Sequence, residues 1–220
     1  MEITDGIENV TPVTLQELEQ KLLIEIRRNG VQDVEVQSLL HDVVLGSNKV
    51  AMRLLAKGRE EASLECLRKA ELLSGPQTLG ELASSQDVVA LRILTQNNLA
   101  CWHRQKGQLE TALSYLKGAE RLGESRGDLK LRSPQAKDYM NPLDSDEEDS
   151  EPSNRTEASC QQVAVTHSNL CAILSELGRH KEALSHAKKA VTFCKQELRL
   201  VIKRHPPGAA WDDHSSRGMG

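Results

Sequence analysis

The stretch that decides the fold is Asn97–Leu122, which reads NNLACWHRQKGQLETALSYLKGAERL. Apolar and small residues recur at helical spacing on both sides of Gly107, which predicts two amphipathic helices joined by a turn at that glycine. Two helices so close along the chain must fold back on each other as a hairpin. Small side chains stand where the two helix backbones should approach most closely, at Ala100, Ala112 and Ala119.

Two further segments repeat this arrangement around a glycine. The closer copy covers residues 169–191 around Gly178, and a weaker copy covers residues 50–70 around Gly58. Three copies that share a turn glycine and one placing of small residues are hard to obtain by chance. A pattern that recurs in this way is typical of a helical repeat array.

The pattern resembles the tetratricopeptide repeat, a helix-turn-helix unit of about 34 residues. The turn glycines are further apart than one such unit, and part of the excess lengthens the first helix of each copy. Long first helices and the run Asn97–Ala100 are similar to the repeats of kinesin light chains. The resemblance implies an all-α fold, an α-solenoid of three irregular hairpins with an N-terminal capping helix and an extended C-terminal helix.

Shifts in composition divide the chain into five parts. Residues 14–124 should form the N-terminal helix and the first two repeats, with Thr14 as the N-cap and Glu17 completing a capping box. Residues 156–204 should form the third repeat with the extended C-terminal helix. We expect disorder in the remaining parts, which are an N-terminal segment (1–13), an acidic insertion (125–155) and a C-terminal tail (205–220).

The expected insertion is acidic, because seven carboxylates and no basic residue lie between Asp138 and Glu151. Such a stretch cannot bury enough apolar surface to offset the entropy of ordering it. Ser145 is followed by Asp-Glu-Glu, which predicts phosphorylation by an acidophilic kinase and altered contact with basic surfaces such as the last helix. A solvated spacer with an incidental serine is the alternative interpretation.

Composition narrows the class of protein. Aromatic residues make up only 2% of the chain, which favours helices packed through Leu and Ala over a β-sandwich or barrel. The net charge is −4, and the sequence lacks the concentrated basic patch that a nucleic-acid-binding surface would normally show. Nucleic-acid binding is therefore not expected. No apolar run is long enough to span a bilayer, and Met1–Val10 does not resemble a signal peptide. The five cysteines are scattered along the chain. Together with the lack of a membrane span and of a signal peptide, this scatter predicts a cytoplasmic protein with free thiols.

No motif in the sequence predicts catalysis. A glycine-rich phosphate loop, a nucleophile elbow and an H-E-x-x-H motif are all missing. Cys101 and His103 should point to different faces of a helix, so they cannot act as a nucleophile and its base. His180 and His186 do not have the i, i+4 spacing of a helical metal site. We therefore expect neither an enzyme nor a bound cofactor or metal.

The resemblance implies a concave groove lined by the first helix of each repeat, where extended peptides or partner helices bind. Counting back ten, nine, six and three residues from each turn glycine gives equivalent positions. The predicted groove residues are Asn48, Lys49, Met52 and Leu55, then Asn97, Asn98, Cys101 and Arg104, then Ser168, Asn169, Ala172 and Ser175. Asparagine amides both donate and accept hydrogen bonds, which suits a peptide backbone, and solvation by water is the alternative.

Some relatives bind acidic chaperone C-termini through a carboxylate clamp that includes a central asparagine. The corresponding positions here are Met52, Cys101 and Ala172, so the clamp is absent and a chaperone co-factor is disfavoured.

The sequence therefore predicts a scaffold or adaptor that binds a peptide or helix of a partner protein in the groove. The alternative is a structural subunit of a cytoskeletal or motor assembly that docks through its extended C-terminal helix. A homo-oligomer formed through this helix would support the alternative, with contacts at Val191, Cys194, Leu198 and Val201.

Overall fold

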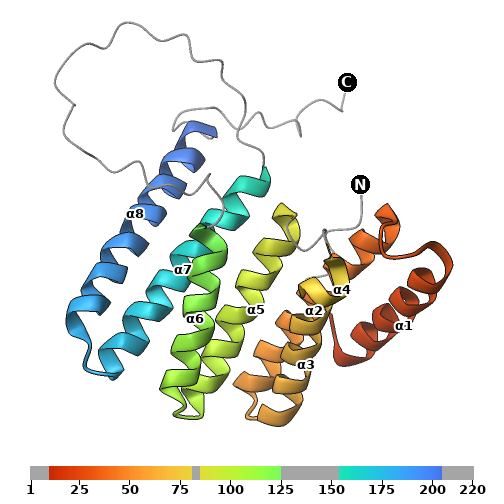
Figure 1. Ribbon diagram of the computed structural model, residues 1–220, viewed down its shortest axis with the longest axis horizontal. Coiled ribbons are helices and arrows are strands. Elements are labelled where there is room, and N and C mark those ends of the chain that lie inside the picture. The colour runs from red at the N-terminus through yellow and green to blue at the C-terminus, as the bar shows by residue number, and fades with distance from the viewer. Residues whose placement is uncertain (1–9, 81–84, 125–153, 205–220) are drawn as a thin grey trace, which may run out of the picture.

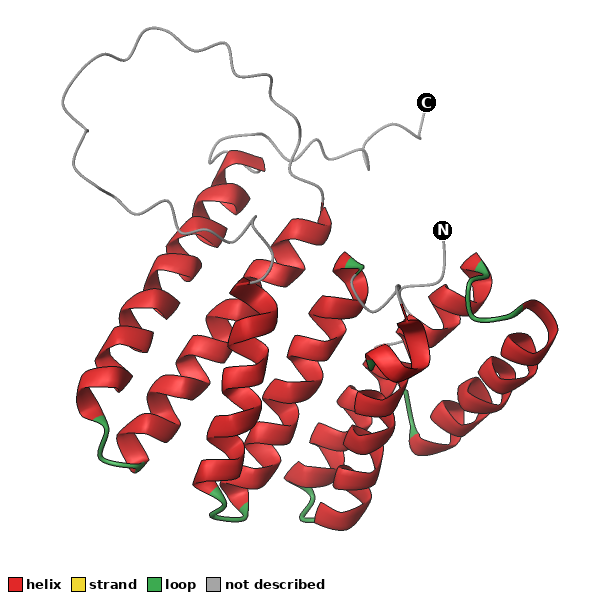
Figure 2. Cartoon of the chain, in the orientation of Figure 1, coloured by secondary structure: helices red, strands yellow, loops and turns green. Residues whose placement is uncertain are grey.

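The computed structural model describes residues 10–80, 85–124 and 154–204, and each element in these ranges is a helix (Figures 1 and 2). The helices are α1 (Pro12–Asn29), α2 (Val34–Ala56), α3 (Glu60–Leu73), α4 (Pro76–Leu79), α5 (Gln86–Gln105), α6 (Leu109–Glu124), α7 (Asn154–Glu176) and α8 (His180–Arg204). They stand in a row from α1 at one end to α8 at the other (Figure 1). The pairs α2–α3, α5–α6 and α7–α8 form hairpins, which confirms the predicted all-α helical solenoid.

The three hairpins share one turn, built around a glycine. Gly58, Gly107 and Gly178 have φ values of 72°, 72° and 73°, in the left-handed region that other residues rarely adopt. In each turn the N–H of the following residue donates to a carbonyl five residues earlier, as Gln108 does to His103 at 2.9 Å. This bond closes the end of the first helix in a Schellman arrangement. The turn of the weak copy, around Gly58, therefore has the same backbone conformation as the turns of the other two copies.

Helix α1 packs against α2 and caps the open end of the row. Its N-cap is Thr11, whereas the sequence predicted Thr14. Pro12 supplies a fixed φ suited to the first helical residue, and Thr14 Oγ1 accepts a 2.7 Å hydrogen bond from the N–H of Thr11. Val10 is buried in the core cluster shared with α2, so the expected disorder is wrong just before the helix. Residues 1–9 lie outside the described part.

The third repeat also begins earlier than predicted. Helix α7 starts at Asn154 rather than after Thr156, so the last two residues of the expected insertion are helical. The rest of that insertion (125–153), with Ser145, and the expected tail (205–220) lie outside the described residues.

The core is divided among the interfaces between successive hairpins. One cluster joins α2, α3 and α5, and another joins α5 and α6 to α7 and α8. Ala100, Ala112 and Ala119 are at most 1% exposed, which confirms that the small residues lie at helix contacts. Each hairpin therefore depends on its neighbours to bury its apolar face, as in other repeat arrays.

Candidate functional site

The first helices of the three hairpins, α2, α5 and α7, lie in chain order, and each contacts the next. Their hairpin turns all lie along one edge of the row (Figure 1). Equivalent positions counted from the turn glycines can therefore be compared directly between the three helices.

The position ten residues before the glycine is buried in the first two repeats. Asn48 and Asn97 are 1% and 2% exposed. The Asn48 amide donates to Thr95 Oγ1 of α5 at 2.9 Å, and the Asn97 amide donates to Thr166 Oγ1 of α7 at 2.9 Å. The prediction that Asn48 and Asn97 line an open groove is wrong, because each side chain instead bonds the next first helix. Ser168, at the same position in the third repeat, is exposed.

The two Asn–Thr bonds form a polar ladder, a term we use for the pairs Asn48–Thr95 and Asn97–Thr166. Each threonine hydroxyl also donates to a carbonyl of its own helix at 2.9 Å. Both ladder partners are thus held in place while they link one repeat to the next. Buried polar groups that are paired in this way fix the register between packed helices.

Positions nine and six residues before each glycine are half-exposed in all three repeats. They form what we call the register surface, which consists of Lys49, Met52, Asn98, Cys101, Asn169 and Ala172. Asn98 donates to Asn48 Oδ1 at 2.8 Å, which anchors the surface to the polar ladder. Among the described residues, the Asn169 amide has no hydrogen-bond partner, so it can bond a ligand.

Positions three residues before the glycine differ among the repeats. Leu55 is buried, and the Ser175 hydroxyl donates to the carbonyl of Cys171 in its own helix at 2.8 Å. Arg104 reaches from α5 to Glu176 of α7, with Nε 2.8 Å from Oε1. The hydrogen bond that Arg104 donates to the Glu176 carboxylate raises the pKa of Arg104, and the pair links the second hairpin to the third. Arg104 is therefore engaged within the protein.

Cys101 lies on the register surface as a neutral thiol. Burial raises the pKa of this thiol, and the nearby Arg104 offsets only part of that effect. A thiol with a raised pKa is a weak nucleophile at neutral pH. Cys101 therefore adds apolar contact area to the surface.

Helix α8 carries a row of exposed apolar residues on its outer side. Leu184, Val191 and Leu198 recur every seven residues and are 57%, 53% and 58% exposed. Cys194 lies between the last two and is also exposed. We call these four residues the heptad stripe. The side chain of Val201, which the sequence also placed in an oligomer contact, lies outside the described part.

A cluster of polar side chains joins α6, α7 and α8, and sequence reasoning did not find it. Glu120, His167, His186 and Lys189 meet within hydrogen-bond or ion-pair distance. Burial, and then the Lys189 ammonium, lowers the pKa of His167 to about 4, and burial chiefly lowers the pKa of His186. Both imidazoles are therefore neutral at pH 7.

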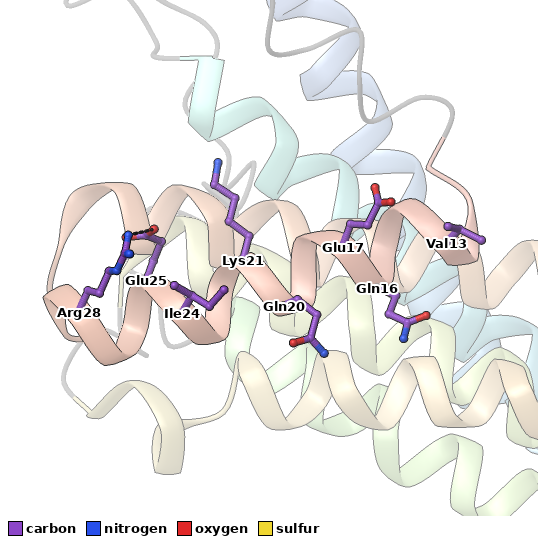
Figure 3. A pocket seen from close by; sticks show the side chains of 8 residues that line it. All are labelled: Val13, Gln16, Glu17, Gln20, Lys21, Ile24, Glu25 and Arg28. Atoms are coloured by element: carbon purple, nitrogen blue, oxygen red, sulfur yellow. Dashed lines mark ion pairs between the residues drawn. The ribbon is translucent and has the colours of Figure 1, made fainter.

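The outer face of α1 presents a shallow hollow, and Figure 3 shows the eight side chains that line it. They come from α1 alone, and they include the exposed apolar residues Val13 and Ile24 between charged and amide side chains. Because a single helix forms this hollow, it is an open surface. Its residues indicate no specific binding or catalytic function for this face.

Comparison with known proteins gives a family for the second and third hairpins. Residues 92–119 and 163–206 match the family model of the tetratricopeptide repeat. No curated protein matches the chain. Within the described ranges, no helix is both long and apolar enough to cross a membrane.

Proposed function

We propose that this chain, a member of the tetratricopeptide repeat family, is a scaffold or adaptor that binds a peptide or helix of a partner along α2, α5 and α7. Repeats of this family generally mediate protein–protein interaction. Repeats of this family are typically not enzymes, and the proposal assigns no catalysis. The unpaired thiols of Cys66, Cys101, Cys171 and Cys194 favour a reducing compartment, so we place this function in the cytoplasm.

The register surface is the observation that carries the proposal. Its six residues occupy the same two positions on three successive helices, and all are half-exposed. Such a row offers two contacts per repeat to an elongated ligand. The Asn169 amide supplies a donor and an acceptor for a backbone, while Met52 and Ala172 supply apolar contact. The polar ladder beneath the surface holds the three helices in register.

Replacing Ala172 by Arg tests this proposal. Ala172 is half-exposed near one end of the register surface, so a long charged side chain there should block an elongated ligand. We expect capture of the partner by the tagged full chain from native cell extract to fall at least tenfold, as measured by quantitative mass spectrometry. Ser114→Arg, at an exposed position of α6, is the matched control and should leave capture unchanged. Equal capture by both variants, with helicity intact, would exclude the register surface.

The heptad stripe supports a second candidate function, a structural subunit that assembles through α8. Apolar residues alternately three and four positions apart form the seam of a coiled coil. On α8, Leu184, Val191 and Leu198 occupy one of these positions in three successive heptads, and Cys194 occupies the other. The occupant that fits most simply is the same stripe of a second copy. We propose this dimer as the alternative mode of action, that of a structural subunit of a cytoskeletal or motor assembly.

Sedimentation equilibrium distinguishes this alternative. If α8 pairs with a second copy, the full chain sediments as a dimer, and Val191→Asp should convert it to a monomer, because a carboxylate in the seam is left desolvated. Ser185→Asp, on the same helix outside the stripe, is the control and should leave the dimer intact. A wild-type chain that sediments as a monomer at tens of micromolar contradicts the alternative.

A further inference from the structure

The cluster at the junction of α6, α7 and α8 has the composition of a metal site. His167 Nδ1 lies 3.1 Å from His186 Nδ1, and Glu120 Oε1 lies 3.8 Å and 3.7 Å from these two atoms. The side chains of His167, His186 and Glu120 are 4%, 15% and 17% exposed. Two imidazoles and one carboxylate, each from a different helix, therefore direct their donor atoms at one point.

The separations between these atoms match the size of a zinc-class ion. The point equidistant from the three donor atoms lies about 2.1 Å from each, and Zn–N and Zn–O bonds measure about 2.0 to 2.2 Å. A tetrahedral ion requires ligand atoms about 3.3 Å apart, which side-chain shifts of a few tenths of an ångström would give. Imidazole nitrogens favour a transition-metal ion over Ca²⁺ or Mg²⁺, which prefer oxygen ligands.

The surroundings hold these side chains in position. The ring of His167 stacks on Phe193 of α8, with centroids 5.6 Å apart and an interplanar angle of 20°. Both histidines point Nδ1 toward the shared point, so each would bind an ion as the neutral tautomer that carries its proton on Nε2.

The ammonium group of Lys189 already lies next to the Glu120 carboxylate. Lys189 Nζ is 3.1 Å from Glu120 Oε1 and 3.8 Å from Glu124 Oε1. The ammonium competes with a metal for Glu120, and Glu124 offers it a second carboxylate at the surface. Lys189 is about one-third exposed, so its flexible side chain can move to that position.

We propose that Glu120, His167 and His186 bind one divalent ion of the zinc class, with water as the fourth ligand. The ion joins the second helix of one repeat to both helices of the next. Because it binds the folded chain through three helices, it stabilises the docking of the last hairpin.

Titration of the metal-free full chain with Co²⁺, in the presence of a non-chelating phosphine reductant, tests the site. We expect one equivalent of Co²⁺ to give the visible d–d absorption of a tetrahedral ion without thiolate charge-transfer bands. Stoichiometric Zn²⁺ should displace the Co²⁺ and raise the melting temperature. Absence of these bands, or bands of the thiolate type, overturns the proposal.

Variants of the proposed ligands and of their neighbours test where the ion binds. His186→Asn and Glu120→Gln, which are nearly isosteric, should each weaken Co²⁺ binding at least tenfold. His180→Asn, at an exposed position on the same helix, should bind as the wild type does. Lys189→Ala should strengthen binding severalfold, because it removes the competing ammonium. Wild-type affinity in His186→Asn, or equal loss in Lys189→Ala and Glu120→Gln, would show that the ion lies elsewhere.

Discussion

Replacing Leu170 by Ala should lower the free energy of unfolding by about 2–5 kcal/mol, the range found when a buried leucine is truncated. Leu170 is fully buried in α7, in the cluster that joins the second and third hairpins. Its loss opens a cavity between two repeats that depend on each other for burial. Urea unfolding followed by circular dichroism measures the change.

Leu184→Ala on α8 is the matched control, because it removes the same atoms from a side chain that is 57% exposed. Its effect should stay within about 0.5 kcal/mol in the monomer. Similar destabilisation by the two substitutions would mean that the third hairpin does not pack against the second at Leu170.

Replacing Asn48 by Ala should lower the free energy of unfolding by about 1–3 kcal/mol. Asn48 donates to Thr95 and accepts from Asn98, so its removal leaves polar groups of α5 without partners. The cost arises from these unpaired groups as much as from the lost contacts. Chemical denaturation gives the value, and amide hydrogen exchange should show the loss at the α2–α5 interface.

Asn169→Ala provides the comparison for this second prediction. Asn169 is half-exposed and, among the described residues, has no hydrogen-bond partner. We expect a change within about 0.5 kcal/mol. If Asn48→Ala proved equally mild, the polar ladder would contribute nothing to the stacking of the repeats.

The fold could be predicted because its signals are local. Each turn needs a glycine with positive φ, and each close helix contact needs a small side chain, as at Gly107 and Ala112. Both requirements place a particular type of residue, a glycine or a small side chain, at a fixed spacing in the sequence. The N-cap of α1 was predicted wrongly at Thr14, because Thr11 has the same capping chemistry and Pro12, at the first helical position, favours Thr11.

The candidate site was harder to predict, because it depends on how each helix is rotated against the next. Asn97 and Asn98 are neighbours in the sequence, yet Asn97 is buried against α7 and Asn98 is half-exposed. Repeated asparagines indicated a shared position, but the same amide chemistry serves a neighbouring helix or a ligand. Composition alone does not tell these two uses apart.

The cluster of Glu120, His167 and His186, which we propose as a metal site, was missed for a related reason. A search for histidines on one helix considers His180 and His186, whose spacing does not suit a metal. The partners of His186 come instead from α6 and α7, and only the packing of three helices brings them together. No sequence pattern of fixed spacing connects such residues.

Photo-crosslinking from the two ends of the register surface tests the central claim most directly. A photoreactive side chain replaces Met52 in one variant and Ala172 in another, with Ser114 on α6 as the control position. We predict that Met52 and Ala172 crosslink to the same partner polypeptide and that Ser114 does not. A partner that crosslinks from Ser114, or from neither end of the surface, would contradict a ligand bound along α2, α5 and α7.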